Sequence, residues 1–254
     1  MNSSLKIIAL PAFDDNYIWL LTYNDEAVCV DAGQAEPVLN YVRQHNLRLV
    51  QMWTTHPHGD HTGGIVQLKR ALPDCRIFGA RDIPTSDEIV GEGSTITWQH
   101  FHINVWHTAG HTANHLTYVL HDDEQTHLFC GDTLFSAGCG RVFPDGRADW
   151  LHHSLQRINR QPENTLLYPA HEYTANNLRF AAHIEPDNPD IQAALSAAQH
   201  TPTLPTTLAH ERHINPFLRV HLPDVQQRVS KLCSLDMQED EAVFIALREL
   251  KNHF

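Results

Sequence analysis

Long apolar runs are absent from this sequence of 254 residues. No segment approaches the roughly 18–20 consecutive apolar residues that a helix needs to cross a bilayer. The apolar stretch within residues 1–10 is too short for a signal peptide, and the acidic pair Asp14 and Asp15 argues against a transit peptide. We therefore expect a cytoplasmic protein with no membrane partner.

Cysteine pairs and positive charge are also scarce. The five cysteines form no CxxC motif and are odd in number, so without a secretory signal reduced thiols are a better interpretation than a disulfide framework. Lysine and arginine total 18 against 30 acidic residues, and the formal net charge is −12. A protein that binds phosphate backbones needs basic surface, so we expect no nucleic-acid partner. The expected protein is a monomer that acts on a small molecule.

The order of secondary structure predicts two parts. β-prone segments and two helices alternate in the first part, and helices separated by prolines follow Tyr173. We therefore predict a layered α/β domain over residues 1–172 and a helical domain over residues 173–254. The expected strands are 5–10, 17–23, 27–30, 49–54, 76–79, 102–107, 116–120 and 127–130, and the expected helices are 37–45, 65–71, 176–184, 190–199, 225–232 and 239–251.

Histidine is what the sequence has in excess, with 20 copies. An isolated one such as His45 is usually a solvated side chain, but residues 55–61 place His56, His58, Asp60 and His61 within six positions, just after a predicted strand. In an extended stretch the first two point the same way, and Gly59 then lets the chain turn. Four ligands this close do not easily surround one ion, so the spacing indicates two.

Three further residues of ligand type lie at predicted strand ends or turns: His111, Asp132 and His171. The total of five histidines and two aspartates exceeds what one ion needs, because a single zinc usually takes three or four protein ligands. Imidazole and carboxylate without thiolate suit zinc, iron or manganese. Asp31 has two open interpretations, a turn residue before Gly33 or a carboxylate that orients a ligand histidine.

These motifs resemble the metallo-β-lactamase superfamily and, within it, the glyoxalase II (hydroxyacylglutathione hydrolase) family. The superfamily match lies in segments 55–61, 110–112, 131–133 and 171–174, and the match to the glyoxalase II branch lies in segments 138–141 and 215–219. The resemblance covers essentially the whole chain. It implies an αββα sandwich followed by a C-terminal helical domain.

The same resemblance implies roles for individual residues. One metal ion, zinc by expectation, would be held by His56, His58 and His111, and a second by Asp60, His61 and His171, with Asp132 as the bridge. Glutathione would be bound by Arg141, Tyr173, Arg248 and Lys251. Phe143 also belongs to the implied substrate site, at a position where some relatives have tyrosine, whose hydroxyl phenylalanine lacks.

The implied reaction is hydrolysis of S-D-lactoylglutathione to D-lactate and glutathione, a step in methylglyoxal detoxification. Asp60 and Asp132 would act with a hydroxide that bridges two divalent ions, whose charge brings the pKa of water down towards about 7. Three alternatives remain open: a sulfur dioxygenase of the same superfamily with one iron and glutathione persulfide as substrate, a β-lactamase, and a metal-binding module without turnover. A nuclease is disfavoured by the acidic charge.

Overall fold

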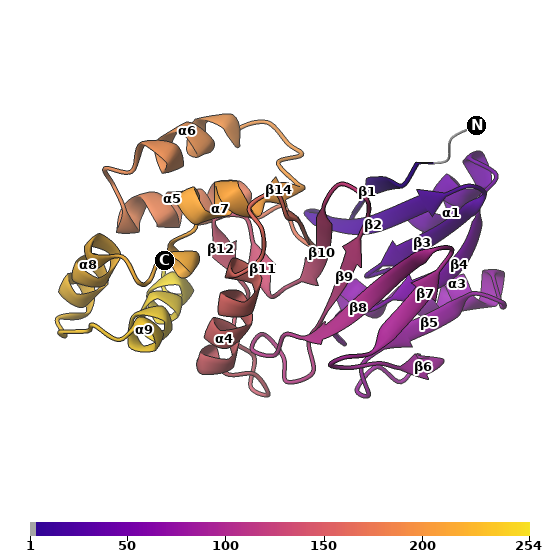
Figure 1. Ribbon diagram of the computed structural model, residues 1–254, viewed down its shortest axis with the longest axis horizontal. Coiled ribbons are helices and arrows are strands. Elements are labelled where there is room, and N and C mark those ends of the chain that lie inside the picture. The colour runs from indigo at the N-terminus through magenta and orange to yellow at the C-terminus, as the bar shows by residue number, and fades with distance from the viewer. Residues whose placement is uncertain (1–3) are drawn as a thin grey trace.

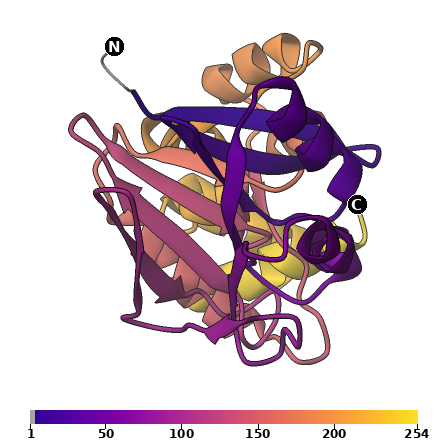
Figure 2. The ribbon, with the colours of Figure 1, turned by 90° about the vertical axis from the view of Figure 1, so that its right-hand side faces the viewer.

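The computed structural model describes residues 4–254, and its strands form two sheets that lie face to face (Figure 1, Figure 2). Within the described residues the first sheet has the order β1-β2-β3-β4-β5-β6. Its strands are β1 Lys6–Ala12, β2 Asn16–Tyr23, β3 Glu26–Val30, β4 Arg48–Trp53, β5 Arg76–Gly79 and β6 Glu88–Ile89. The first three strands pair antiparallel, and β3 to β6 pair parallel.

The second sheet has the order β14-β13-β10-β9-β8-β7. Its strands are β7 Thr95–Trp98, β8 Phe101–His107, β9 Leu116–His121, β10 Thr126–Gly131, β13 Leu166–Pro169 and β14 Thr206–Thr207, and a separate hairpin joins β11 Leu134–Phe135 to β12 Gly138–Cys139. Strand β13 runs parallel to β10, while the other neighbours are antiparallel.

Helices cover the outer face of each sheet, at opposite sides of the molecule (Figure 1). The first part of the chain contains α1 Ala35–Gln44, the single turn α2 Gly59–Thr62 and α3 Ile65–Ala71. The later helices are α4 Ala148–Asn159, α5 Thr174–Ile184, α6 Pro189–Ala197, α7 Leu208–Ile214, a 3-10 turn at Pro216–Leu218, α8 Pro223–Cys233 and α9 Asp240–Asn252.

Strand β2 is apolar over most of its length because both of its faces are covered. Trp19 and Leu21 lie in the apolar cluster between the two sheets, whereas Ile18 and Leu20 lie in the cluster beneath α1 and α3. Successive side chains of a strand point to opposite faces, so a strand covered on both sides is apolar throughout. The predicted αββα sandwich with C-terminal helices is confirmed.

A third apolar cluster joins the C-terminal helices to the second sheet. It contains Leu128 of β10, Leu155 of α4, Phe217 of the 3-10 turn and Phe244 of α9. The helices beyond residue 173 therefore share one core with the second sheet. The division of the chain into residues 1–172 and 173–254 stays a prediction.

Helix α4 and strand β13 were not predicted. The apolar side chains of α4, Leu151, Leu155 and Ile158, are spaced at i, i+4 and i+7, so the helical period was present in the sequence. Strand β13 has only four residues and no alternation to detect, because it is almost wholly buried. It nevertheless matters for function, since its end places His171 beside the end of β10.

All five cysteines are free thiols, and four of them are buried, as the composition predicted. Among residues 4–254 no helix is both long enough and apolar enough to cross a membrane.

Candidate metal centre

The residues of ligand type come from loops at the ends of strands. His56 and His58 follow β4, His111 lies between β8 and β9, Asp132 follows β10, and His171 follows β13. Because β4, β10 and β13 end at the same side of the sandwich, residues more than a hundred positions apart in sequence converge there. A rigid sheet holds such loops still.

Three histidines form the first group of side chains. His58 Nδ1 lies 2.9 Å from His56 Nε2 and 3.2 Å from His111 Nε2. These three nitrogens are among the groups whose ligand atoms lie within 4.8 Å of one another. We call His56, His58 and His111 the histidine trio.

Asp60, His61 and His171 form a second group, which we call the mixed trio. Asp60 Oδ2 lies 3.3 Å from His61 Nε2 and 3.3 Å from His171 Nε2. The turn that separates Asp60 and His61 from the histidine trio is α2, which begins at Gly59. A Cβ at Gly59 would meet no atom within 4 Å, so the turn does not depend on glycine there, contrary to the sequence-based expectation.

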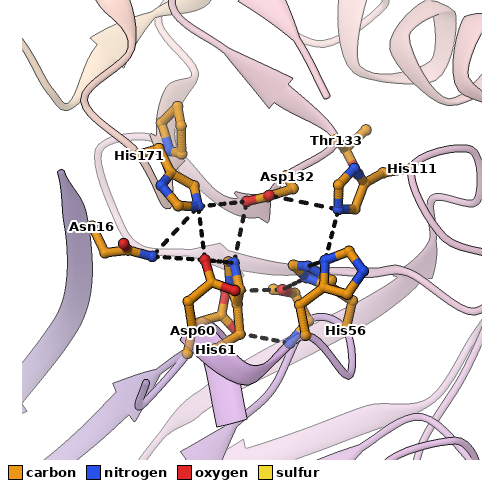
Figure 3. Close-up of polar contacts among 12 residues, drawn as sticks. Asn16, His56, Asp60, His61, His111, Asp132, Thr133 and His171 are labelled. Atoms are coloured by element: carbon orange, nitrogen blue, oxygen red, sulfur yellow. Dashed lines mark hydrogen bonds and ion pairs between the residues drawn. The ribbon is translucent and has the colours of Figure 1, made fainter. Parts of the chain in front are cut away.

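Asp132 lies between the two trios (Figure 3). Its Oδ1 is 3.4 Å from His61 Nε2 and 3.5 Å from His171 Nε2, while its Oδ2 is 3.6 Å from His111 Nε2. One carboxylate oxygen thus faces each trio. The structure brings together all seven side chains that the sequence singled out as ligands.

The outward nitrogens of four histidines have partners, which fixes the direction of each ring. His111 Nδ1 lies 2.7 Å from the carbonyl oxygen of Arg141, and His171 Nδ1 lies 2.9 Å from Asp15 Oδ1. The remaining contacts are His56 Nδ1 with Thr55 Oγ1 at 3.0 Å and His61 Nδ1 with Asp31 Oδ2 at 3.0 Å. Metal-binding histidines are held in this way as a rule.

Asp31 combines its two open interpretations. Its φ of 57° is the left-handed conformation of a turn, which aspartate tolerates better than most residues. Its carboxylate faces His61 and also accepts hydrogen bonds of 2.8 Å from the backbone N–H and the hydroxyl of Thr55. The carboxylate, just after β3, therefore links Thr55, just after β4, to His61 of α2.

Asp15 and Asn16 were missed by the sequence reasoning. Asn16 Nδ2 donates to Asp60 Oδ2 at 3.1 Å (Figure 3). Asp15 ends the turn before β2, and Asn16 is the first residue of that strand. The sequence marked residues 14–16 only as a turn signal. Nothing local shows that this turn touches His171, because the contact forms only when β2 packs beside the end of β13.

Electrostatics differ between the two trios. Burial lowers the pKa of His56 and of His111, so these rings keep a free lone pair for a ligand bond. The imidazole nitrogens of His171 and His61, each 3.3 Å from Asp60 Oδ2, hold the pKa of Asp60 far below its usual range. Burial alone would lower the pKa of His61, but the charges of Asp132 and Asp31 outweigh it and raise the pKa. The mixed trio therefore attracts positive charge.

Two buried atoms in the centre indicate a bound cation. Within residues 4–254, His61 Nε2 and Asp132 Oδ1 have no hydrogen-bond partner. Buried polar atoms without partners are costly, and both atoms point at the space between the trios. Nitrogen and carboxylate donors in this number fit divalent metal ions.

A cavity of about 460 Å³ opens onto the centre. It is lined by side chains of both trios and by the five residues that the sequence associated with substrate: Arg141, Phe143, Tyr173, Arg248 and Lys251. The ring of Tyr173 stacks on His171 at 4.6 Å, and the ring of Phe143 lies 4.3 Å from that of His58.

Arg248 lines the cavity and also has a structural role. Its guanidinium is buried, and Nη1 donates to the carbonyl oxygens of Cys139 at 2.9 Å and Gly140 at 3.3 Å. Arg248 therefore attaches α9 to the end of the β11–β12 hairpin as well as lining the cavity. Lys251 is only partly buried, and its Nζ lies 3.4 Å from the carbonyl oxygen of Asn176.

Comparison with known proteins agrees with this geometry. The model of the metallo-beta-lactamase superfamily matches residues 12–85, and the model of the hydroxyacylglutathione hydrolase C-terminus matches residues 172–254. Two solved structures share the fold. ETHE1 from Myxococcus xanthus has a TM-score of 0.65 at 22% identity, covering 98% of this chain and 99% of that chain. A metallo-beta-lactamase from Staphylococcus aureus subsp. aureus COL has a TM-score of 0.66 at 19% identity, covering 99% and 72%.

Curated relatives are much closer in sequence. A hydroxyacylglutathione hydrolase from Neisseria meningitidis serogroup C (strain 053442) is 52% identical over 98% of this chain and 99% of that protein. Another from Chromohalobacter salexigens is 43% identical over 98% of this chain and 100% of that protein.

The fold and the two groups of metal-binding side chains define a protein of the metallo-beta-lactamase superfamily. Within it, the chain belongs to the hydroxyacylglutathione hydrolase family, also called glyoxalase II. It is therefore an enzyme, a thioester hydrolase.

Proposed function

We propose that this enzyme hydrolyses S-D-lactoylglutathione to D-lactate and glutathione, with two divalent metal ions, zinc by preference. The observation that carries the proposal is the position of Asp132, with one carboxylate oxygen towards each trio at 3.4–3.6 Å from three ligand nitrogens. A single ion would leave the side chains of one trio without a metal ion to bind. His56, His58 and His111 would hold one ion, Asp60, His61 and His171 the other, and Asp132 would bridge them.

Bound metal would supply a Lewis acid for the thioester carbonyl and a water of lowered pKa. Side chains of the protein set the net charge of the site. Asp132 and Asp60 contribute two negative charges, so two dications and a hydroxide leave a surplus near +1 that favours an oxyanion. A thiolate leaves readily, so no strong acid is needed beside the sulfur.

The cavity supplies positive charge for glutathione, although the chain as a whole is acidic. Arg141, Arg248 and Lys251 line it together with the aromatic rings of Phe143 and Tyr173. Carboxylates of a peptide-like substrate pair with such groups through charge-assisted hydrogen bonds. We propose further that residues 173–254 form the helical substrate domain, which contributes the last three of the five side chains, and that the enzyme is a cytoplasmic monomer.

The test measures two quantities on one sample: loss of thioester absorbance with S-D-lactoylglutathione, and metal content by elemental analysis. About two ions per chain and rapid hydrolysis are expected. One ion per chain even after reconstitution with zinc, iron or manganese, together with oxygen uptake on glutathione persulfide, would replace the proposal by the dioxygenase. Two ions without turnover on any thioester would leave a metal-binding module.

A further inference from the structure

A histidine outside both trios, His115, contacts the histidine trio and the backbone of Asp132. His115 lies just before β9, fully buried, and its ring stacks on that of His56 with centroids 4.8 Å apart and an interplanar angle of 23°. Its Nε2 lies 3.1 Å from the backbone nitrogen of Asp132. The sequence reasoning passed over it, because a histidine at that position carries no local ligand pattern.

The hydrogen bonds determine where the proton of His115 sits. A backbone N–H can only donate, so Nε2 must accept with its lone pair. The hydrogen therefore sits on Nδ1, which lies 3.1 Å from Thr133 Oγ1 and 3.3 Å from Thr108 Oγ1. Thr133 Oγ1 in turn has the carbonyl oxygen of Thr108 as an acceptor at 3.4 Å. The Nδ1–H of His115 and the hydroxyl of Thr133 thus each have an acceptor. The imidazole of His115 is neutral and carries its hydrogen on Nδ1.

The backbone at Asp132 is shaped around this ring. Gly131 adopts a φ of +48°, and a Cβ there would lie 2.9 Å from His115 Nε2 and 2.5 Å from Thr55 Oγ1. Only glycine lets the chain pass this close to the ring and still turn the carboxylate of Asp132 into the centre. The ring and the turn thus determine where that carboxylate lies.

We propose that His115 is a positioning residue, which holds the carboxylate of Asp132 midway between the two trios through the hydrogen bond from the Asp132 backbone and steadies His56 by stacking. It binds neither substrate nor metal. This inference rests on the proposed two-metal site. Its consequence is that loss of the Nε2 acceptor loosens the bridge and lowers metal affinity, while the cavity that binds glutathione is untouched.

Two amide variants separate the hydrogen bond from packing. In His115→Gln, Oε1 stands the same number of bonds from Cα as Nε2 and can accept from Asp132. In His115→Asn, the amide reaches only the position of Nδ1 and can still meet Thr133. We expect His115→Asn to lose about tenfold or more in kcat and in zinc affinity measured by chelator competition, the usual range for groups that orient a metal ligand. His115→Gln should retain both within about threefold, and KM should change less than twofold in either variant.

His102→Asn, at an exposed side chain of β8, is the matched control and should behave as wild type. Equal losses in His115→Gln and His115→Asn would show that only packing matters and would overturn the proposal, as would wild-type zinc affinity in His115→Asn. Chelator competition does not depend on turnover, so it decides the case even where activity is low. Failure of the wild-type enzyme to hydrolyse the thioester would count against the proposed function instead.

Discussion

At the scale of single residues, Asp132 is the side chain on which the two trios meet. Its two oxygens face nitrogens of opposite trios, and its backbone is held by His115. A bridging carboxylate sets the distance between two ions, and therefore the position of whatever they share. Its removal should disturb chemistry more than folding, because the apolar clusters that hold the layers lie elsewhere.

Asp132→Ala should lower kcat by far more than tenfold, with a thermal unfolding midpoint of the metal-free protein close to that of wild type. Asp123→Ala, an exposed aspartate in the β9–β10 turn, is the control. The measurement is steady-state thioester hydrolysis together with elemental analysis. If Asp132→Ala retained more than about a tenth of kcat, less than about 1.4 kcal/mol of barrier would depend on it, and the bridging role would be wrong.

Lys251 should give the proposed substrate site a pH dependence whose sign follows from its lowered pKa. Burial, followed by the charges of Arg248 and Arg141, lowers the pKa of Lys251 to about 8, while the nearby Cys139 acts in the opposite direction. The charged lysine therefore prevails below about pH 8 and is lost as the pH rises through that value. Because kcat/KM reports groups of the free enzyme, it should fall on the alkaline side with a midpoint near pH 8.

Lys251→Met should raise KM for the glutathione thioester about tenfold at pH 7, since a charge-assisted hydrogen bond is worth roughly 1.5–3 kcal/mol. Its kcat/KM should also lack the alkaline fall, whereas Lys251→Arg should keep low KM up to higher pH. Lys231→Met, near the end of α8 and exposed, is the control. An unaltered alkaline fall in Lys251→Arg would assign the transition to another group.

At the scale of elements, the β11–β12 hairpin is held by one buried carboxylate. Glu211 of α7 accepts hydrogen bonds from Ser136 Oγ at 2.7 Å, Ala137 N at 2.8 Å, Thr206 Oγ1 at 2.9 Å and Asn215 Nδ2 at 3.1 Å. Burial raises its pKa despite these bonds. The hairpin connects Asp132 to Arg141, so Glu211 supports the floor of the cavity from the side of the C-terminal helices.

Glu211→Ala should reduce the free energy of unfolding by at least about 2 kcal/mol, because each buried donor left without a partner costs roughly 1–3 kcal/mol. Urea unfolding monitored by circular dichroism measures it. Glu163→Ala removes an exposed pair with Arg212 and should change the same quantity by less than about 1 kcal/mol. A change in Glu211→Ala no larger than in this control would mean that water replaces the carboxylate.

At the scale of the whole molecule, the apolar clusters and the candidate metal centre occupy different places, so folding should not depend on metal binding. Three apolar clusters hold the four layers, and the seven side chains of the centre sit at one end of the sandwich. The fold should therefore survive metal removal. Ligands that bind only the folded state raise its stability by mass action, so metal should still increase the unfolding temperature.

Dialysis against a chelator should abolish hydrolysis while far-UV circular dichroism keeps its wild-type shape. Added zinc should restore activity and raise the unfolding midpoint by several degrees. The same treatment of Asp132→Ala should give a smaller rise. Loss of secondary structure on chelation would show that the metal centre is part of the folding core and not an addition to it.

The metal motif and most secondary-structure elements could be predicted from residues that are close together in the sequence. Ligand types in residues 55–61 stand so close together that no tertiary arrangement is needed to see a metal motif. Alternation and helical period predicted most strands and helices, because these patterns reflect burial on one or both faces. One exception, β13, is short and almost wholly buried and has no period to detect, whereas α4 was not predicted although its helical period is present in the sequence.

Only the tertiary structure decided how the parts meet. The contact of Asp15 with His171 and that of Arg248 with Cys139 join residues more than a hundred positions apart. The cavity likewise brings side chains of α9 next to the metal centre. The contact of Asp132 with His115 spans 17 positions. Such pairs leave no trace in local spacing, because the order of strands in the sheets brings them together. The sequence determined which side chains have the chemistry to bind metal, and the packing of two sheets determined which of them face each other.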